Sequence, residues 1–141
     1  MEISILIAEA RSWLGTPWHH QASVRGVGCD CAGLVRGVGN ALGLMNCCEG
    51  ASGAEEFEGY GRRPEPKRML RALDRFMDRR LPGQIYPGDV LLLRFDRDPQ
   101  HLAILTDENS MVHALIKNGV VEHRLSADWR ARVVAAWSYR G

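Results

Sequence analysis

Apolar residues recur at helical spacing in three segments of the first 80 residues. The first segment covers residues 3–14 and is followed by Gly15 and Pro17, which end helices. A second helix is expected to begin just after Asp30, because an aspartate carboxylate accepts hydrogen bonds from the free N–H groups of a first turn. A third helix is predicted from about Pro66 to Arg80.

The pattern changes to short apolar runs after residue 87, which predicts strands. Asn118-Gly119 stands between two of these runs and is a strong hairpin signal. Helices precede strands along the chain, so we expect an α+β fold with an antiparallel sheet. The length of 141 residues predicts one domain, residues 1–141. The strands are expected at 90–95, 101–106, 111–116, 120–125 and 133–139.

Composition and charge narrow the functional classes. The chain is 45% hydrophobic and 25% charged, with a formal net charge of +1, which is typical of a globular protein and argues against a nucleic-acid partner. The basic residues of the third helix are interpreted as its solvated face. No apolar run approaches membrane-spanning length, and the N-terminus lacks the pattern of a secretory signal, so we expect neither membrane insertion nor signal-dependent export.

The four cysteines are Cys29, Cys31, Cys47 and Cys48. Their C-x-C and C-C spacings differ from those of structural zinc sites, so we expect free thiols, no metal and no cofactor. A zinc site built from Cys29, Cys31 and a histidine remains an alternative.

Cys31 is the candidate nucleophile. If a helix begins after Asp30, Cys31 lies in its first turn, where free N–H groups and the helix dipole stabilise a thiolate and the oxyanion formed by its attack on a carbonyl. The small residues Ala32 and Gly33 would let a substrate backbone approach. The alternative is that Cys31 is a small buried apolar residue, as many cysteines are.

A thiol nucleophile needs a base, and two histidines lie in consecutive predicted strands. If His101 and His113 share a face, one can act as base and the other can orient it, and a thiolate–imidazolium pair would lower the pKa of the cysteine. Each histidine could instead be a hydrogen-bonded core residue. We interpret His123, after the Asn-Gly turn, as a surface residue.

These motifs together resemble the NlpC-type cell-wall peptidases, a papain-like family. The resemblance covers nearly the whole chain: Gly15-Thr16-Pro17-Trp18, Asp30-Cys31-Ala32-Gly33-Leu34-Val35, Pro87-Gly88-Asp89-Val90, His101-Leu102-Ala103-Ile104 and Met111-Val112-His113-Ala114.

The resemblance implies a papain-like fold, with the nucleophile at a helix start packed on an antiparallel sheet. It implies a catalytic triad of Cys31, His101 and His113, and hydrolysis of the bond between D-glutamate and a diamino acid in peptidoglycan stem peptides. The N-terminal motifs look like a subgroup encoded in phage and phage-like tail clusters, so tail proteins are expected partners. A particle made in the cytoplasm would then carry the enzyme to the wall.

Substrate contacts are expected from Trp18 and His20 in the loop before the nucleophile, and from Asp30 and Ala32 beside it. Many family members have Tyr at the position of Trp18, and an indole supplies only an N–H donor. Two alternatives to hydrolysis remain at this stage. The same triad could transfer the acyl group to an amine or lipid, or the chain could be a structural tail component with little catalysis.

Overall fold

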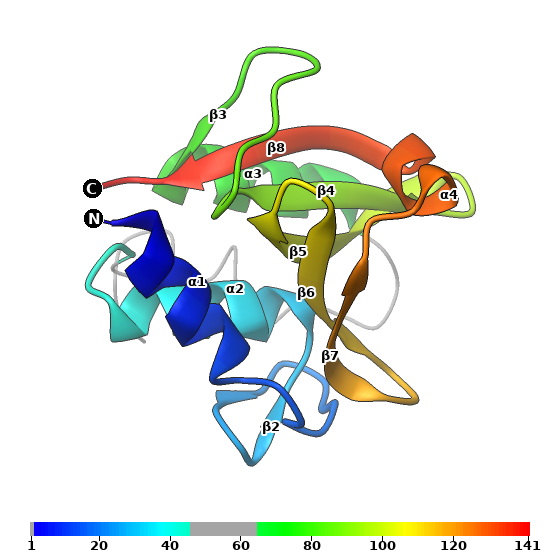
Figure 1. Ribbon diagram of the computed structural model, residues 1–141. Coiled ribbons are helices and arrows are strands. Elements are labelled where there is room, and N and C mark those ends of the chain that lie inside the picture. The colour runs from blue at the N-terminus through cyan, green and yellow to red at the C-terminus, as the bar shows by residue number, and fades with distance from the viewer. Residues whose placement is uncertain (1, 46–64) are drawn as a thin grey trace.

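The computed structural model describes residues 2–45 and 65–141, which build helices around a six-stranded antiparallel sheet (Figure 1). The strands lie in the order β3-β8-β4-β5-β6-β7. The sheet consists of β3 (Met77–Arg79), β4 (Val90–Phe95), β5 (Asp98–Asp107), β6 (Ser110–Leu115), β7 (Gly119–Arg124) and β8 (Val133–Tyr139). The helices are α1 (Ile3–Arg11), α2 (Cys31–Ala41), α3 (Pro66–Phe76) and α4 (Ala127–Ala131), and β1 (Ser23–Val24) pairs with β2 (Gly28–Cys29). The α+β class and the five long strands are confirmed.

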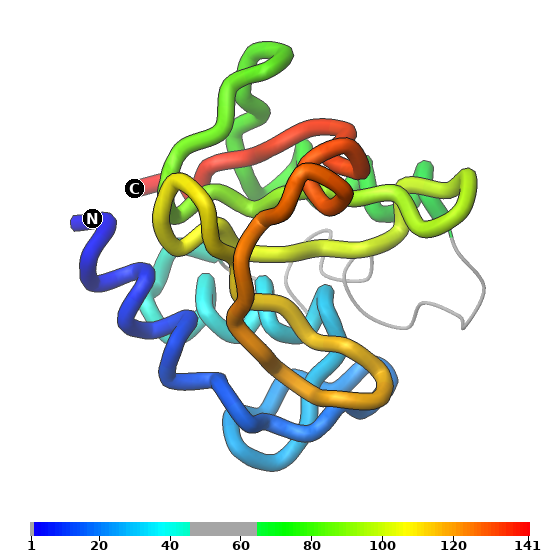
Figure 2. The backbone as a smooth tube through the Cα atoms, turned by 45° about the vertical axis from the view of Figure 1, so that its right-hand side comes forward, coloured from blue at the N-terminus to red at the C-terminus, as the bar shows by residue number. Residues whose placement is uncertain are grey.

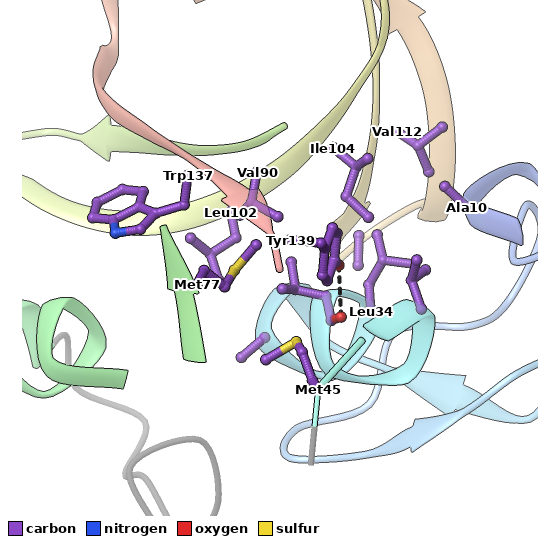
Figure 3. Packing of buried hydrophobic residues seen from close by; sticks show 14 of the residues in the cluster. Ala10, Leu34, Met45, Met77, Val90, Leu102, Ile104, Val112, Trp137 and Tyr139 are labelled. Atoms are coloured by element: carbon purple, nitrogen blue, oxygen red, sulfur yellow. Dashed lines mark hydrogen bonds between the residues drawn. The ribbon is translucent and has the colours of Figure 1, made fainter. Parts of the chain in front are cut away.

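The two faces of the sheet bury different sets of apolar side chains, because successive residues of a strand point to opposite faces. One face carries the large core beneath α1 and α2, and Figure 3 shows part of this packing. Tyr139 crosses this interface, and its hydroxyl donates a 2.7 Å hydrogen bond to the carbonyl of Val35 in α2. The opposite face carries a smaller cluster of Leu91, Leu93, Ala103, Leu105, Met111, Leu125 and Ala136.

The third helix is shorter than the sequence pattern predicted. It ends at Phe76, and Met77 turns to an extended conformation and pairs with Tyr139 of β8. Met77 is 1% exposed, and it is buried as a residue of β3 rather than on the apolar face of a helix. The prediction of helix up to Arg80 is therefore wrong, because pairing with the distant β8 outweighs local helical spacing.

The hairpin signal is confirmed, with a modified turn. Leu115 pairs with Gly119, which has a φ of +72°, so residues 116–118 form the loop between β6 and β7. Gly119 also approaches the loop that precedes β1: the N–H of Val120 donates to the carbonyl of Thr16 at 2.9 Å. Figure 2 shows this loop, in blue, beside the hairpin, in orange. The hairpin therefore holds the segment that leads to α2.

Candidate active site

Cys31 is the first residue of α2, and Asp30 is the N-cap. The two carboxylate oxygens of Asp30 accept hydrogen bonds from the N–H groups of Gly33, at 2.8 Å, and Gln21, at 2.7 Å. This confirms that the helix begins where the capping residue predicted it. Since Gln21 belongs to the preceding loop, the same carboxylate ties that loop to the start of the helix.

The sulfur of Cys31 is surrounded by backbone donors. The N–H groups of Leu102, Ala32 and Cys31 itself hydrogen-bond to it and lower its pKa. Burial and, secondarily, the negative charge of Asp30 act in the opposite direction and prevail, raising the pKa of Cys31 to about 12. The resting thiol is therefore protonated at neutral pH.

The contact with Leu102 places the sulfur of Cys31 beside β5, at the end where β5 is no longer paired with β6. The pairs between β5 and β6 run from Ile104–Val112 to Asp107–Ser110. Beyond Ile104, the residues around Leu102 pair with β4 on the other side. The N–H group of Leu102, the residue after His101, thus points toward the sulfur of Cys31 instead of toward β6.

His101 and His113 face each other across this opening, with His101 Nε2 at 2.7 Å from His113 Nδ1. Both side chains point to the same face of the sheet. Leu105 of β5 pairs with Met111 of β6, and His101 and His113 lie an even number of residues from Leu105 and Met111, respectively. His101 and His113 are 5% and 0% exposed. The ring of Phe95 stacks on His101, with 4.5 Å between centroids and 15° between planes.

Burial makes both imidazoles weak bases. It lowers the pKa of His101 to about 3, with repulsion from His113 as the second cause. It lowers the pKa of His113 to about 4, with repulsion from His123 as the second cause. Together with the raised pKa of Cys31, this favours a neutral thiol and neutral imidazoles in the resting protein, rather than the thiolate–imidazolium pair that the sequence led us to expect.

A third histidine continues the row. His123 is half-buried, and its Nε2 lies 2.7 Å from Nε2 of His113. His123 is partly exposed, as its interpretation as a surface residue implies, but its ring also bonds to the buried His113, which the sequence did not predict. Its position in β7, two residues beyond Val121, which pairs with His113, gives it the same face as His113. Strand alternation could have indicated this only if the register of the hairpin had been known.

The other predicted site residues are Trp18, His20, Asp30 and Ala32, and they differ in burial and in their contacts. Trp18 is half-buried, forms a bridge with Cys29 and packs against the main core, as Cys31 does. The ring of His20 lies 6.3 Å from that of Trp18. Ala32 is 5% exposed, and Asp30 is 4% exposed.

Gly33 serves packing rather than substrate access. A Cβ atom at this position would lie 1.8 Å from the carbonyl oxygen of Ala22. The space beside Gly33 is thus filled by the loop that precedes α2. Our expectation that Gly33 leaves room for a substrate backbone is wrong.

Cys29 is fully buried, and burial raises its pKa to about 12. Cys47 and Cys48 lie outside the described residues. Within residues 2–45 and 65–141, no group of three or more His, Cys, Asp or Glu side chains is arranged to hold a metal ion. No helix in the same ranges is long and apolar enough to cross a membrane.

A helix that begins with a cysteine, packed on an antiparallel sheet that carries paired histidines, defines a papain-like α+β protein. Residues 15–138 match the model of the NlpC/P60 family, and the chain belongs to this family. The resemblance recognised in the sequence motifs is thereby confirmed at the level of the family.

Solved structures share this fold. The NlpC/p60 domain of the peptidoglycan hydrolase SagA superposes with a TM-score of 0.68 at 19% identity, covering 98% of this chain and 99% of that one. An NlpC/P60 family protein from Bacillus cereus gives a TM-score of 0.70 at 16% identity, and the match covers 100% of this chain but 41% of that protein.

The non-catalytic NlpC/p60 domain protein RipD from Mycobacterium tuberculosis gives a TM-score of 0.58 at 16% identity, covering 98% of this chain and 97% of that one. No curated protein sequence matches this chain. The fold therefore occurs both in a hydrolase and in a protein described as non-catalytic. The fold alone does not show whether this protein is active, and the arrangement of its side chains is the relevant evidence.

Proposed function

We propose that this protein is a cysteine peptidase that cleaves peptidoglycan stem peptides, with Cys31 as nucleophile, His101 as base and His113 as the group that orients His101. The observation that carries the proposal is the sulfur of Cys31 at a capped helix start, hydrogen-bonded by backbone N–H groups, one of them from the residue next to His101. A cysteine that served packing alone would need neither these backbone donors nor a pair of hydrogen-bonded histidines that includes the residue next to Leu102.

The raised pKa of the Cys31 thiol and the lowered pKa of His101 oppose proton transfer in the resting protein, so we propose that the proton moves only together with the attack. As the sulfur attacks the substrate carbonyl, His101 takes the thiol proton, so charge develops only when the tetrahedral intermediate forms. Backbone N–H groups at the start of α2 then stabilise the oxyanion. Collapse of the intermediate breaks the C–N bond, His101 returns the proton to the leaving amine, and a thioester to Cys31 remains. Water, deprotonated by His101, releases the acid and the thiol.

The substrate class is part of the same proposal. SagA is a peptidoglycan hydrolase, and the motifs around Cys31 and His101 resemble those of enzymes that cut between D-glutamate and a diamino acid. We propose that Trp18 and His20, which belong to the loop before Cys31, contact the stem peptide together with Asp30 and Ala32. Transport within a phage-like tail particle is a further part of the proposal, and co-sedimentation of the chain with such particles tests it.

Purified protein is incubated with defined stem peptides, and the products are identified by mass spectrometry. We expect two fragments separated at the D-glutamyl–diamino acid bond. Cys31→Ala is expected to lower the rate by at least on the order of 10³-fold, whereas the matched variant Cys29→Ala, two residues away, retains the activity. Equal turnover by wild type and Cys31→Ala would overturn the proposal.

A second candidate is a binding protein without catalysis, which RipD exemplifies within the same fold. In that case the peptides would bind without cleavage, and Cys31→Ala would bind them equally well. Transfer of the acyl group is distinguished in the same assay, because an added amine would then appear in the product in place of water.

A further inference from the structure

We propose that His123 is a positioning residue, which fixes the tautomers of His113 and His101 and thereby keeps Nδ1 of His101 free to accept a proton. The proposal rests on the proposed function only in naming His101 as the base. The proposal is based on a row of hydrogen bonds that joins His101, His113 and His123 and ends at the backbone carbonyl of Arg124.

The row has three contacts in sequence. His101 Nε2 lies 2.7 Å from His113 Nδ1, and His113 Nε2 lies 2.7 Å from His123 Nε2. His123 Nδ1 lies 2.9 Å from the carbonyl oxygen of Arg124. Every ring nitrogen of the three histidines except Nδ1 of His101 is thus engaged in the row.

The carbonyl of Arg124 fixes which atom donates in every hydrogen bond of the row, because a carbonyl oxygen only accepts hydrogen bonds. Nδ1 of His123 therefore carries the proton, and in the neutral ring Nε2 is the acceptor. His113 must donate to it from Nε2, which leaves Nδ1 of His113 as an acceptor. His101 must then donate from Nε2, and its Nδ1 carries no proton.

Aromatic neighbours hold the three imidazole rings in their orientations. His113 is fully buried, and its ring is in edge contact with Trp129, at 5.2 Å between centroids. Trp129 also contacts His123, at 5.4 Å. Phe95 stacks on His101 at the other end. The rings cannot turn to other partners without leaving a buried nitrogen unsatisfied, which costs about 1–3 kcal/mol.

Loss of His123 releases this constraint. In His123→Ala, Nε2 of His113 has no acceptor, and the alternative tautomer with the proton on Nδ1 of His113 becomes competitive. That tautomer donates to Nε2 of His101 and moves the proton of His101 to Nδ1, the atom that a base needs free. His123→Gln restores an acceptor oxygen near the former Nε2 and is expected to restore the original row.

The test uses full-length protein with ¹⁵N-labelled histidine at pH 7, because ¹⁵N shifts distinguish protonated from bare ring nitrogens. We expect the proton on Nε2 of His101 and His113 and on Nδ1 of His123. In His123→Ala the His101 and His113 signals should shift toward the other tautomer, and His123→Gln should return them. Wild-type protein with the proton on Nε2 of His123 overturns the proposal.

Kinetics provide the second readout. The wrong tautomer of a catalytic histidine costs about 10⁴-fold in a serine triad, and a partial loss should lower kcat in His123→Ala on the order of 10- to 100-fold with KM nearly unchanged. His123→Ala with wild-type shifts and wild-type kcat contradicts the positioning role. If no variant or wild type cleaves stem peptides but the wild-type tautomers are as expected, the proposed function fails and the row of histidines stands.

Discussion

The carboxylate of Asp30 caps the helix on which Cys31 stands and, at the same time, its charge raises the pKa of the Cys31 thiol. The two effects act on different properties. The hydrogen bond to Gly33 stabilises the helix start, whereas the charge disfavours the thiolate. A substitution that keeps the hydrogen bond and removes the charge separates them.

Asp30→Asn is expected to lower the pKa of Cys31, because the amide oxygen can still cap the helix while the negative charge is gone. A larger thiolate fraction at a given pH should speed alkylation of Cys31 by iodoacetamide at pH 8. The free energy of unfolding should fall by about 1–3 kcal/mol, because the amide oxygen can accept from the N–H of only one of Gly33 and Gln21, and the NH₂ group then faces the other N–H. Peptide mapping after timed labelling measures the rate, and a slower rate in Asp30→Asn would contradict the electrostatic assignment.

Cys31 should react with iodoacetamide before Cys29. Cys31 is half-buried and hydrogen-bonded by N–H groups that favour its thiolate, whereas Cys29 is fully buried. His101→Ala should slow the labelling of Cys31 if His101 is the base that we propose, because the group that receives the thiol proton is then lost. Earlier labelling of Cys29, read by mass spectrometry of the two alkylated forms, would show that the nucleophile is wrongly assigned.

The neutral histidines predict that acid destabilises the fold. The pKa values of His101 and His113, about 3 and about 4, lie below the value of about 6.5 for an unfolded histidine. Between these limits the unfolded chain binds more protons, so the free energy of unfolding falls as the pH drops below about 6.5. Each histidine contributes up to about 1.4 kcal/mol per pH unit.

Urea unfolding at pH 7.5 and pH 5 measures this effect. The difference between the two pH values should be smaller in His113→Gln than in wild type, because Gln does not titrate. An unchanged pH dependence in this variant would mean that His113 is not held neutral by burial. Comparing the change in the free energy of unfolding between the two pH values, rather than its absolute value, removes the pH-independent loss of stability that the substitution itself causes.

Gly33→Ala should destabilise the protein although alanine is the better helix former. A Cβ atom at Gly33 would meet the carbonyl oxygen of Ala22 at 1.8 Å, so backbone must shift. We expect a loss of about 1–3 kcal/mol. Gly83→Ala is the control: Gly83 has a φ of +80° but open space around it, so its cost is about 1–2 kcal/mol from the backbone conformation. A gain in stability in Gly33→Ala would contradict the close approach.

Much of the fold followed from patterns that are local in sequence. The helix after Asp30 begins at the predicted residue because a side-chain cap acts within three residues of itself. The strand Val90–Phe95 was predicted with its observed limits. The helix ending at Phe76 was predicted too long, because the pairing of Met77 with Tyr139 joins residues that are far apart in the chain.

The sequence by itself determined the α+β class, the family and the candidate site residues, because these depend on local spacing and on short motifs. Only the tertiary structure decided how β5 and β6 separate beyond Ile104, and therefore that the amide of Leu102 turns to Cys31 and that His101 meets His113. It also decided that His123 joins them. The reason is physical: strand register and burial fix which rings meet and how far their pKa values move, and both arise from contacts between distant parts of the chain.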